Sequence, residues 1–144
     1  MNHDAAMAVV DYSSGIGEVL WAAHSERYSK VKNDHYLNWA IVNEANTYGP
    51  FNKVVYYEKP LLKKTRQLYA GQWSDAFSYT EMPQWHLDTF NIKIDEYVKH
   101  HDSHAAAGYF TSPFREATIL TVDAIGEWDT VSISTANKVW IERK

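Results

Sequence analysis

The sequence has 144 residues, a length typical of one domain with a buried core. Hydrophobic residues make up 45% of the chain and charged residues 22%, which is a globular composition that excludes extensive disorder. A net charge of -4 provides no basic field for nucleic-acid phosphates or an anionic membrane surface, and no segment approaches the roughly 18 apolar residues of a membrane span. Cysteine is absent, which excludes disulfides, thiolate metal ligands and cysteine nucleophiles. We therefore expect a cytoplasmic protein in which only His, Asp or Glu side chains could hold a metal ion.

The first third of the chain predicts a hairpin followed by a helix. Two short apolar segments, 7–12 and 18–23, flank a Gly-containing turn, which is the pattern of two antiparallel strands. After the charged segment 26–34, apolar residues recur at helical spacing over 35–48, and the pair Gly49-Pro50 ends that pattern.

The middle of the chain is crowded with aromatic residues. The apolar segment 54–57 predicts a buried strand, and the segments 61–68 and 85–90 predict helices. We interpret the aromatic side chains of this region as core packing, because large rings bury much area at low entropic cost; a surface on which a substrate stacks is the alternative. The residues concerned are Trp73, Phe77, Tyr79 and Trp85.

The last third predicts a sheet with one closely packed helix. The clearest strand is 117–123, which leads into a turn at 124–127. A strand over 92–98, a helix over 103–110, and strands over 130–134 and 138–142 that join through Asn137 complete the pattern. This order indicates an α/β or α+β fold, and we expect the last sheet to lack the helices that would cover its second face.

Three residues in this last third form a candidate metal site. On a helix, His100 and His104 would lie one turn apart on the same face, where two imidazoles can bind one ion. Asp123, at the end of the clearest strand, is the candidate third ligand, because functional groups gather at such strand ends in α/β folds. The alternative is that the histidines belong to a solvated, polar helix start capped by its acidic and hydroxyl side chains.

Several linked motifs resemble a known family. His100 begins the run H-H-D-S-H-A-A-A-G-Y, which is followed by T-S-P-F at 111–114 and by I-L-T-V-D-A-I-G-E-W-D-T at 119–130. Upstream stand H-D-A-A at 3–6, E-R-Y-S-K at 26–30 and Y-E-K-P-L-L at 57–62. In this order, across nearly the whole chain, these motifs resemble the N-terminal part of the metal-binding catalytic domain of nodulation-type and antibiotic O-carbamoyltransferases.

The resemblance implies the actin-like ATPase, or ribonuclease H-like, fold. Residues 1–98 would form the first lobe, and residues 99–144 would supply the metal-site helix and the first strands of the second lobe. The implied metal is iron, with zinc as the alternative, held by His100, His104 and Asp123. A fourth Asp ligand of the family has no counterpart in the sequence.

The implied reaction belongs to secondary metabolite biosynthesis. A carbamoyl group would pass from carbamoyl adenylate, made from carbamoyl phosphate and ATP, to a hydroxyl of a small molecule. His3 would act near the acceptor hydroxyl as a general base, the alternative being a frayed terminal residue. Gly126, Glu127 and Thr130 would form a phosphate-binding turn, the alternative being a plain hairpin turn.

The resemblance covers only part of such an enzyme. We expect the chain alone to be inactive, and a partner polypeptide or further sequence to supply the missing lobe and the adenylate-forming domain. The alternatives are a non-catalytic remnant that still binds a metal or a nucleotide, and a decayed fragment that does nothing.

Overall fold

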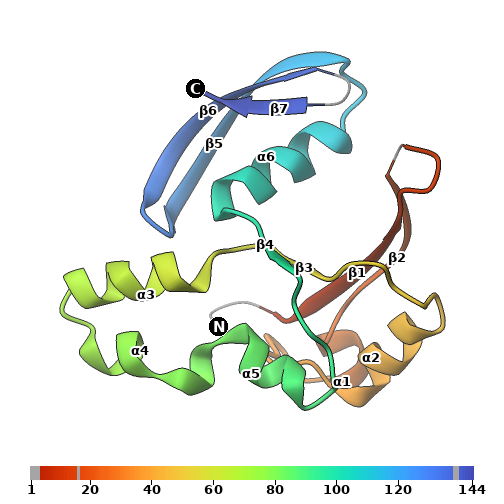
Figure 1. Ribbon diagram of the computed structural model, residues 1–144, viewed down its shortest axis with the longest axis vertical. Coiled ribbons are helices and arrows are strands. Elements are labelled where there is room, and N and C mark those ends of the chain that lie inside the picture. Colours follow the sequence, from red (N-terminus) through yellow and green to blue (C-terminus); the bar gives the residue numbers. More distant parts are fainter. Residues whose placement is uncertain (1–3, 16, 138–139) are drawn as a thin grey trace. The chain divides into compact units, whose positions relative to one another are not determined.

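The computed structural model describes residues 4–15, 17–137 and 140–144 (Figure 1). The chain forms two compact units, each built from two separate stretches. Unit 1 combines Met1–Lys53 with Thr80–Lys93, and unit 2 combines Val54–Tyr79 with Ile94–Lys144. The mixed α/β class is confirmed. The predicted lobes, which divide the chain at residue 98, are a different division and stay a prediction.

Unit 1 contains the predicted hairpin and a short helical layer. Strands β1 (Ala6–Asp11) and β2 (Glu18–His24) pair antiparallel, and the register shifts between Val9 and Val10. Helix α2 (Trp39–Asn46) packs on both strands, and the Asn38 side chain caps it by accepting a hydrogen bond from the Ile41 amide at 3.1 Å. The other elements are α1 (Glu26–Ser29) and α5 (Pro83–Asp88), with the 3-10 turn η1 (Tyr79–Glu81) where the chain enters the unit. The apolar core consists of Ala5, Val9, Ile41, Val42, Ala45 and Leu87.

Unit 2 begins with a minimal parallel pair and a helical hairpin. Strands β3 (Val55–Tyr56) and β4 (Glu96–Tyr97) pair over two residues each. Helix α3 (Pro60–Tyr69) begins at Pro60, whose fixed φ suits the first turn of a helix, and α3 packs on α4 (Trp73–Phe77). The segments predicted as strands over 54–57 and 92–98 are therefore shorter than expected, and the strand over 54–57 is not buried, because Val55 is 53% exposed.

The second part of unit 2 is a three-stranded antiparallel sheet with one helix on it. The sheet order is β5 (Glu116–Gly126), β6 (Asp129–Asn137) and β7 (Trp140–Arg143), and α6 (His100–Phe110) contacts all three strands (Figure 1). Small residues let the helix approach closely, because β6 buries Ser132, Ser134 and Ala136 while α6 buries Ala105.

The other face of this sheet is apolar and exposed. Leu120 lies opposite Ile133, and Val122 lies opposite Val131, so four aliphatic side chains form two cross-strand pairs. Each of the four is at least 49% exposed. The expectation that one sheet face lacks cover is confirmed for the described residues, whereas the helices that would cover it stay a prediction.

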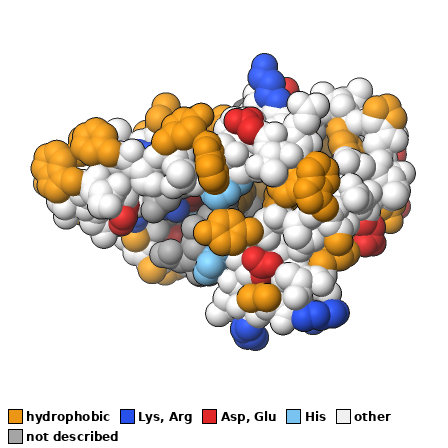
Figure 2. Space-filling model, turned by 90° about the horizontal axis from the view of Figure 1, so that it is seen from below, with side chains coloured by type: hydrophobic (Ala, Val, Ile, Leu, Met, Phe, Trp, Pro, Cys, Tyr) orange, Lys and Arg blue, Asp and Glu red, His pale blue; other side chains and the backbone are white. Residues whose placement is uncertain are grey.

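Two other expectations are wrong. The strand β5 does not turn at 124–127 but continues to Gly126, which pairs with Asp129. The four aromatic residues of the middle region, predicted as core, are all exposed. In α4 the rings of Trp73 and Phe77 stack on each other at 6.5 Å instead of packing beneath another element. Hydrophobic side chains are visible at the surface of the face shown in Figure 2.

None of the described helices has the length and hydrophobicity needed to cross a membrane.

Candidate metal centre

Helix α6 presents two histidines from its first two turns. The helix begins at His100, because Lys99 has an extended backbone and the Glu127 carboxylate accepts the His100 amide at 3.3 Å. A carboxylate at this end also matches the positive pole of the helix dipole. Four residues later, His104 lies one turn further along the helix, and the two Nε2 atoms are 3.0 Å apart.

A bulge in strand β5 accompanies the third side chain. Val122 pairs with Val131, and Gly126 pairs with Asp129, so three residues of β5 lie opposite the single residue Thr130. Such bulges re-aim side chains at the ends of strands. Asp123 is the first residue of this bulge, and its Oδ2 lies 3.0 Å from Nε2 of His100.

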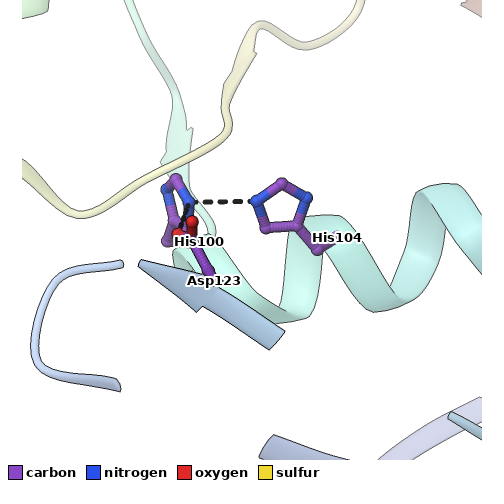
Figure 3. Close-up of side chains that lie close together, drawn as sticks. All are labelled: His100, His104 and Asp123. Carbon is purple, nitrogen blue, oxygen red and sulfur yellow. Dashed lines mark hydrogen bonds and ion pairs between the residues drawn. The ribbon is translucent and has the colours of Figure 1, made fainter. Parts of the chain in front are cut away.

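The three side chains converge from the helix and the strand (Figure 3). One ligand atom from each of His100, His104 and Asp123 lies within 4.8 Å of the others. A metal ion about 2.1 Å from each of two donors holds those donors roughly 3.0–3.4 Å apart, so the 3.0 Å separations of His100 Nε2 from His104 Nε2 and from Asp123 Oδ2 suit a shared ion. Two imidazoles and one carboxylate are also the donor set that zinc and non-haem iron accept. The convergence predicted from the sequence is therefore observed, and metal binding itself stays a prediction.

The charge states also suit a cation. Partial burial, together with the neighbouring His100, lowers the pKa of His104, which keeps its imidazole neutral and able to donate a lone pair. Burial opposes ionisation of Asp123, but the hydrogen bond from the Ala124 amide at 2.7 Å and the two nearby imidazoles outweigh it and lower the pKa of this carboxyl. At neutral pH the His104 imidazole is therefore neutral and the Asp123 carboxylate is ionised.

The turn after β5 supports the site by packing. Gly126 lies against the His100 ring, and a Cβ atom at this position would overlap Cδ2 of that imidazole. Glu127 is buried, adopts a left-handed backbone conformation with φ 57°, and accepts the Lys59 amide at 2.6 Å as well as that of His100. A carboxylate so placed disfavours phosphate at its own position. The predicted phosphate contacts of Gly126, Glu127 and Thr130 stay a prediction.

Two further residues bear on the site: His3, which was predicted from the sequence, and Glu58, which was not. His3 lies outside the described residues, and its expected catalytic role stays a prediction. Glu58 belongs to the Y-E-K-P-L-L motif and has no predicted role, yet its buried carboxylate lies 3.5 Å from Nδ1 of His100. In the sequence, the only feature that could have pointed to this contact is the position of Glu58 as a charged residue directly after a short apolar segment.

Comparison with known proteins identifies the family. The family model described as carbamoyltransferase N-terminus matches residues 56–142, which is more than half of the chain. The chain belongs to the carbamoyltransferase N-terminus family. The predicted resemblance to carbamoyltransferases is thus confirmed, and the match spans α6, β5 and the three converging side chains.

An uncharacterized protein of Synechocystis sp. is a relative of this chain. The two are 28% identical over 160 aligned positions, which cover 91% of the chain and 25% of the relative. The chain therefore spans about a quarter of the length of the curated relative that it matches.

Proposed function

We propose that the chain supplies the metal-binding part of an O-carbamoyltransferase, which transfers a carbamoyl group from carbamoyl adenylate to a hydroxyl of a small molecule. The observation that carries this proposal is the convergence of His100, His104 and Asp123 within a region that matches the carbamoyltransferase family. The expected framework is the actin-like ATPase fold. Further sequence or a partner polypeptide would complete that fold and form the adenylate.

The described residues divide the work at this site. His100 and His104 would donate Nε2 lone pairs, and Asp123 would provide negative charge. The bound metal would act as a Lewis acid toward the reacting group. In comparable sites such an ion lowers the activation free energy by on the order of several kcal/mol. Gly126 and Glu127 would hold His100 in place by close packing and by fixing the start of α6. A small-molecule acceptor and the adenylate would approach the exposed side, where His104 lies.

A second function is a metal-binding or nucleotide-binding module without turnover. The observation that favours it is that the chain covers only 25% of its relative, so most of that protein's length lies outside the match. Metal binding would be the same in both cases, and only group transfer would distinguish them.

The deciding experiment measures carbamoyl transfer. The chain would be incubated with ATP, carbamoyl phosphate and a panel of hydroxylated acceptors, alone and with any polypeptide encoded beside it. We expect no product from the chain alone and carbamoylated product from the mixture. The His100→Ala, His104→Ala double variant should abolish that product, whereas His24→Ala, which changes an exposed histidine of β2, should not.

Each outcome has a clear meaning. Product from the chain alone would show that the site needs no partner. Equal product from the double variant and the wild type would contradict the role of the two histidines. Metal binding without product in any mixture would favour the non-catalytic module.

A further inference from the structure

Three consecutive residues of the Y-E-K-P motif, Tyr57, Glu58 and Lys59, contact the start of α6 or the Glu127 side chain beside it. The carbonyl of Tyr57 accepts a hydrogen bond from Ser103 Oγ at 2.8 Å, and the amide of Lys59 donates to the Glu127 carboxylate at 2.6 Å. The backbone is therefore anchored on both sides of Glu58. Because its backbone is anchored, the Glu58 side chain has little freedom in the direction in which it points.

The Glu58 carboxylate bridges a histidine and a lysine. Its Oε2 lies 3.5 Å from Nδ1 of His100, and its Oε1 lies 3.3 Å from Nζ of Lys63 in the first turns of α3. Glu58 is only 7% exposed, and a buried carboxylate is costly unless it is paired. Lys63 offsets that cost at one oxygen, which leaves the other oxygen for His100.

The two nitrogens of the His100 ring have different surroundings. Nε2 faces His104 and Asp123, each at 3.0 Å, whereas Nδ1 lies on the Glu58 side of the ring. Nδ1 is enclosed and has no hydrogen-bond partner at bonding distance among the described residues. An imidazole that donates its Nε2 lone pair to a metal must carry its proton on Nδ1, and an N–H left unpaired in a buried place costs about 1–3 kcal/mol.

We propose that Glu58 is a positioning residue for the metal site: it accepts the Nδ1 proton of His100 and thereby directs the Nε2 lone pair of that ring at the ion. This inference rests on the proposed metal site. A shift of about 0.5 Å closes the 3.5 Å separation to an ordinary hydrogen bond. Carboxylates that bind the second nitrogen of a ligand histidine in this way fix both its tautomer and its orientation.

Glu58 is not placed to act as a fourth ligand. The carboxylate faces Nδ1, on the opposite edge of the ring from the Nε2 atom that meets the other two ligands. The group of side chains that could share one ion consists of His100, His104 and Asp123 among the described residues. Glu58 thus acts on the ion through His100.

The test compares three variants of the whole chain with the wild type. Glu58→Leu removes the acceptor, and Glu58→Gln keeps an oxygen acceptor but removes the charge. Glu116→Gln changes an exposed glutamate at the far end of β5 and is the matched control. Two quantities are measured for each: the Kd for Zn²⁺ by competition with a chelating dye, and the His100 tautomer from long-range ¹H–¹⁵N correlation spectra without metal.

We expect the Glu58→Leu variant to bind Zn²⁺ about 10–100-fold more weakly than the wild type. Its His100 should lose the preference for the Nδ1–H tautomer that the wild type shows. Glu58→Gln should weaken binding less, by a few-fold and at most about tenfold, since the amide oxygen can still accept the proton. The Glu116→Gln variant should match the wild type in both quantities.

A purely structural Glu58–Lys63 pair would give a different result. In that case Glu58→Leu would lower the stability of the fold but leave the His100 tautomer and the Zn²⁺ Kd of the folded protein unchanged, which would overturn the inference. If the leucine variant does not fold, the glutamine variant carries the same two measurements. A wild type that binds no Zn²⁺ would overturn the metal site itself, and the tautomer measurement on the metal-free protein would still decide what Glu58 does.

Discussion

At the scale of single residues, the two histidine ligands differ in how firmly they are held. The His100 side chain is 18% exposed and lies between Glu58, Gly126 and Asp123, whereas His104 is exposed on the second turn of α6. A ligand that is enclosed by packing keeps its geometry without a metal, and an exposed ligand can rotate to meet it. The structure therefore combines one preset ligand with one adaptable ligand.

The first prediction concerns the ligands themselves. His104→Ala should weaken Zn²⁺ binding by at least about tenfold, because two remaining ligands hold the ion poorly, and the His100→Ala, His104→Ala double variant should bind no ion at the site. Titration calorimetry would measure the affinity of the single variant, and metal analysis after dialysis would measure the metal content of the double variant. Unchanged metal content in the double variant would exclude this site.

The second prediction concerns pH. A ligand imidazole must be neutral, and the lowered pKa of His104 means that protons compete at this ligand only below its ordinary value of 6.5. Zn²⁺ affinity should therefore change little between pH 8 and pH 7 on account of His104 and fall steeply below about pH 6. Affinity that stays constant down to pH 5 would contradict histidine ligation.

The third prediction concerns Gly126, whose missing side chain makes room for His100. Gly126→Ala should displace the imidazole and lower both the unfolding free energy, by about 1–3 kcal/mol, and the Zn²⁺ affinity. Gly108→Ala is the matched control, because no atom lies within 4 Å of a Cβ at that position in α6, and alanine favours a helix by roughly 0.5–1 kcal/mol. Urea unfolding of both variants would show opposite changes if the packing argument holds.

At the scale of elements, the metal site depends on how α6 meets the turn between β5 and β6. The buried Glu127 accepts two backbone amides that belong to different segments, Lys59 before α3 and His100 at the start of α6. The turn thus ties two helix starts to the end of a strand through one carboxylate. The turn therefore helps to fix the position of the histidines, together with the helix that carries them.

The fourth prediction follows from this carboxylate. Glu127→Ala leaves two amides without their acceptor and should lower the unfolding free energy by about 1–3 kcal/mol. Glu116→Ala, at an exposed position of the same sheet, should change it by no more than about 0.5 kcal/mol. Equal denaturant midpoints for the two variants would mean that water replaces the carboxylate without cost.

The same scale shows what the sequence could and could not predict. Strong periodic patterns predicted the hairpin β1–β2, helix α3 and the start of strand β5 close to their observed positions, because alternation and helical spacing are local properties. The spacing of His100 and His104 likewise predicted their proximity. By contrast, the exposure of Trp73 and the contacts of Glu58 and Glu127 depend on which distant segments pack together, and no local pattern encodes that choice.

At the scale of the whole molecule, the outer face of the β5–β6–β7 sheet stands out because it is apolar and uncovered. The pairs Leu120–Ile133 and Val122–Val131 place four exposed aliphatic side chains side by side. Exposed apolar patches of this kind mark surfaces that bind other protein. In the proposed enzyme this face would pack against the completing lobe.

The fifth prediction is that the purified chain self-associates through this face. Sedimentation velocity should show a weight-average mass that rises with protein concentration, and Val122→Lys should shift the distribution toward monomer. Thr118→Lys, on the same side of β5 but outside the aliphatic pairs, is the control and should have a smaller effect. A single monomeric species at all concentrations would contradict this use of the surface.

The chain passes between the two units three times, after Lys53, after Tyr79 and after Lys93. A single peptide-bond cleavage therefore divides at least one unit between two fragments. A cut after Tyr79, for example, would separate the hairpin and α2 from Leu87 in the core of unit 1, and would separate α3 from α6 in unit 2. The two fragments could regain both cores only by binding each other, so proteolysis at this point should yield a nicked but associated protein, and splitting the gene there would make each half dependent on the other for folding.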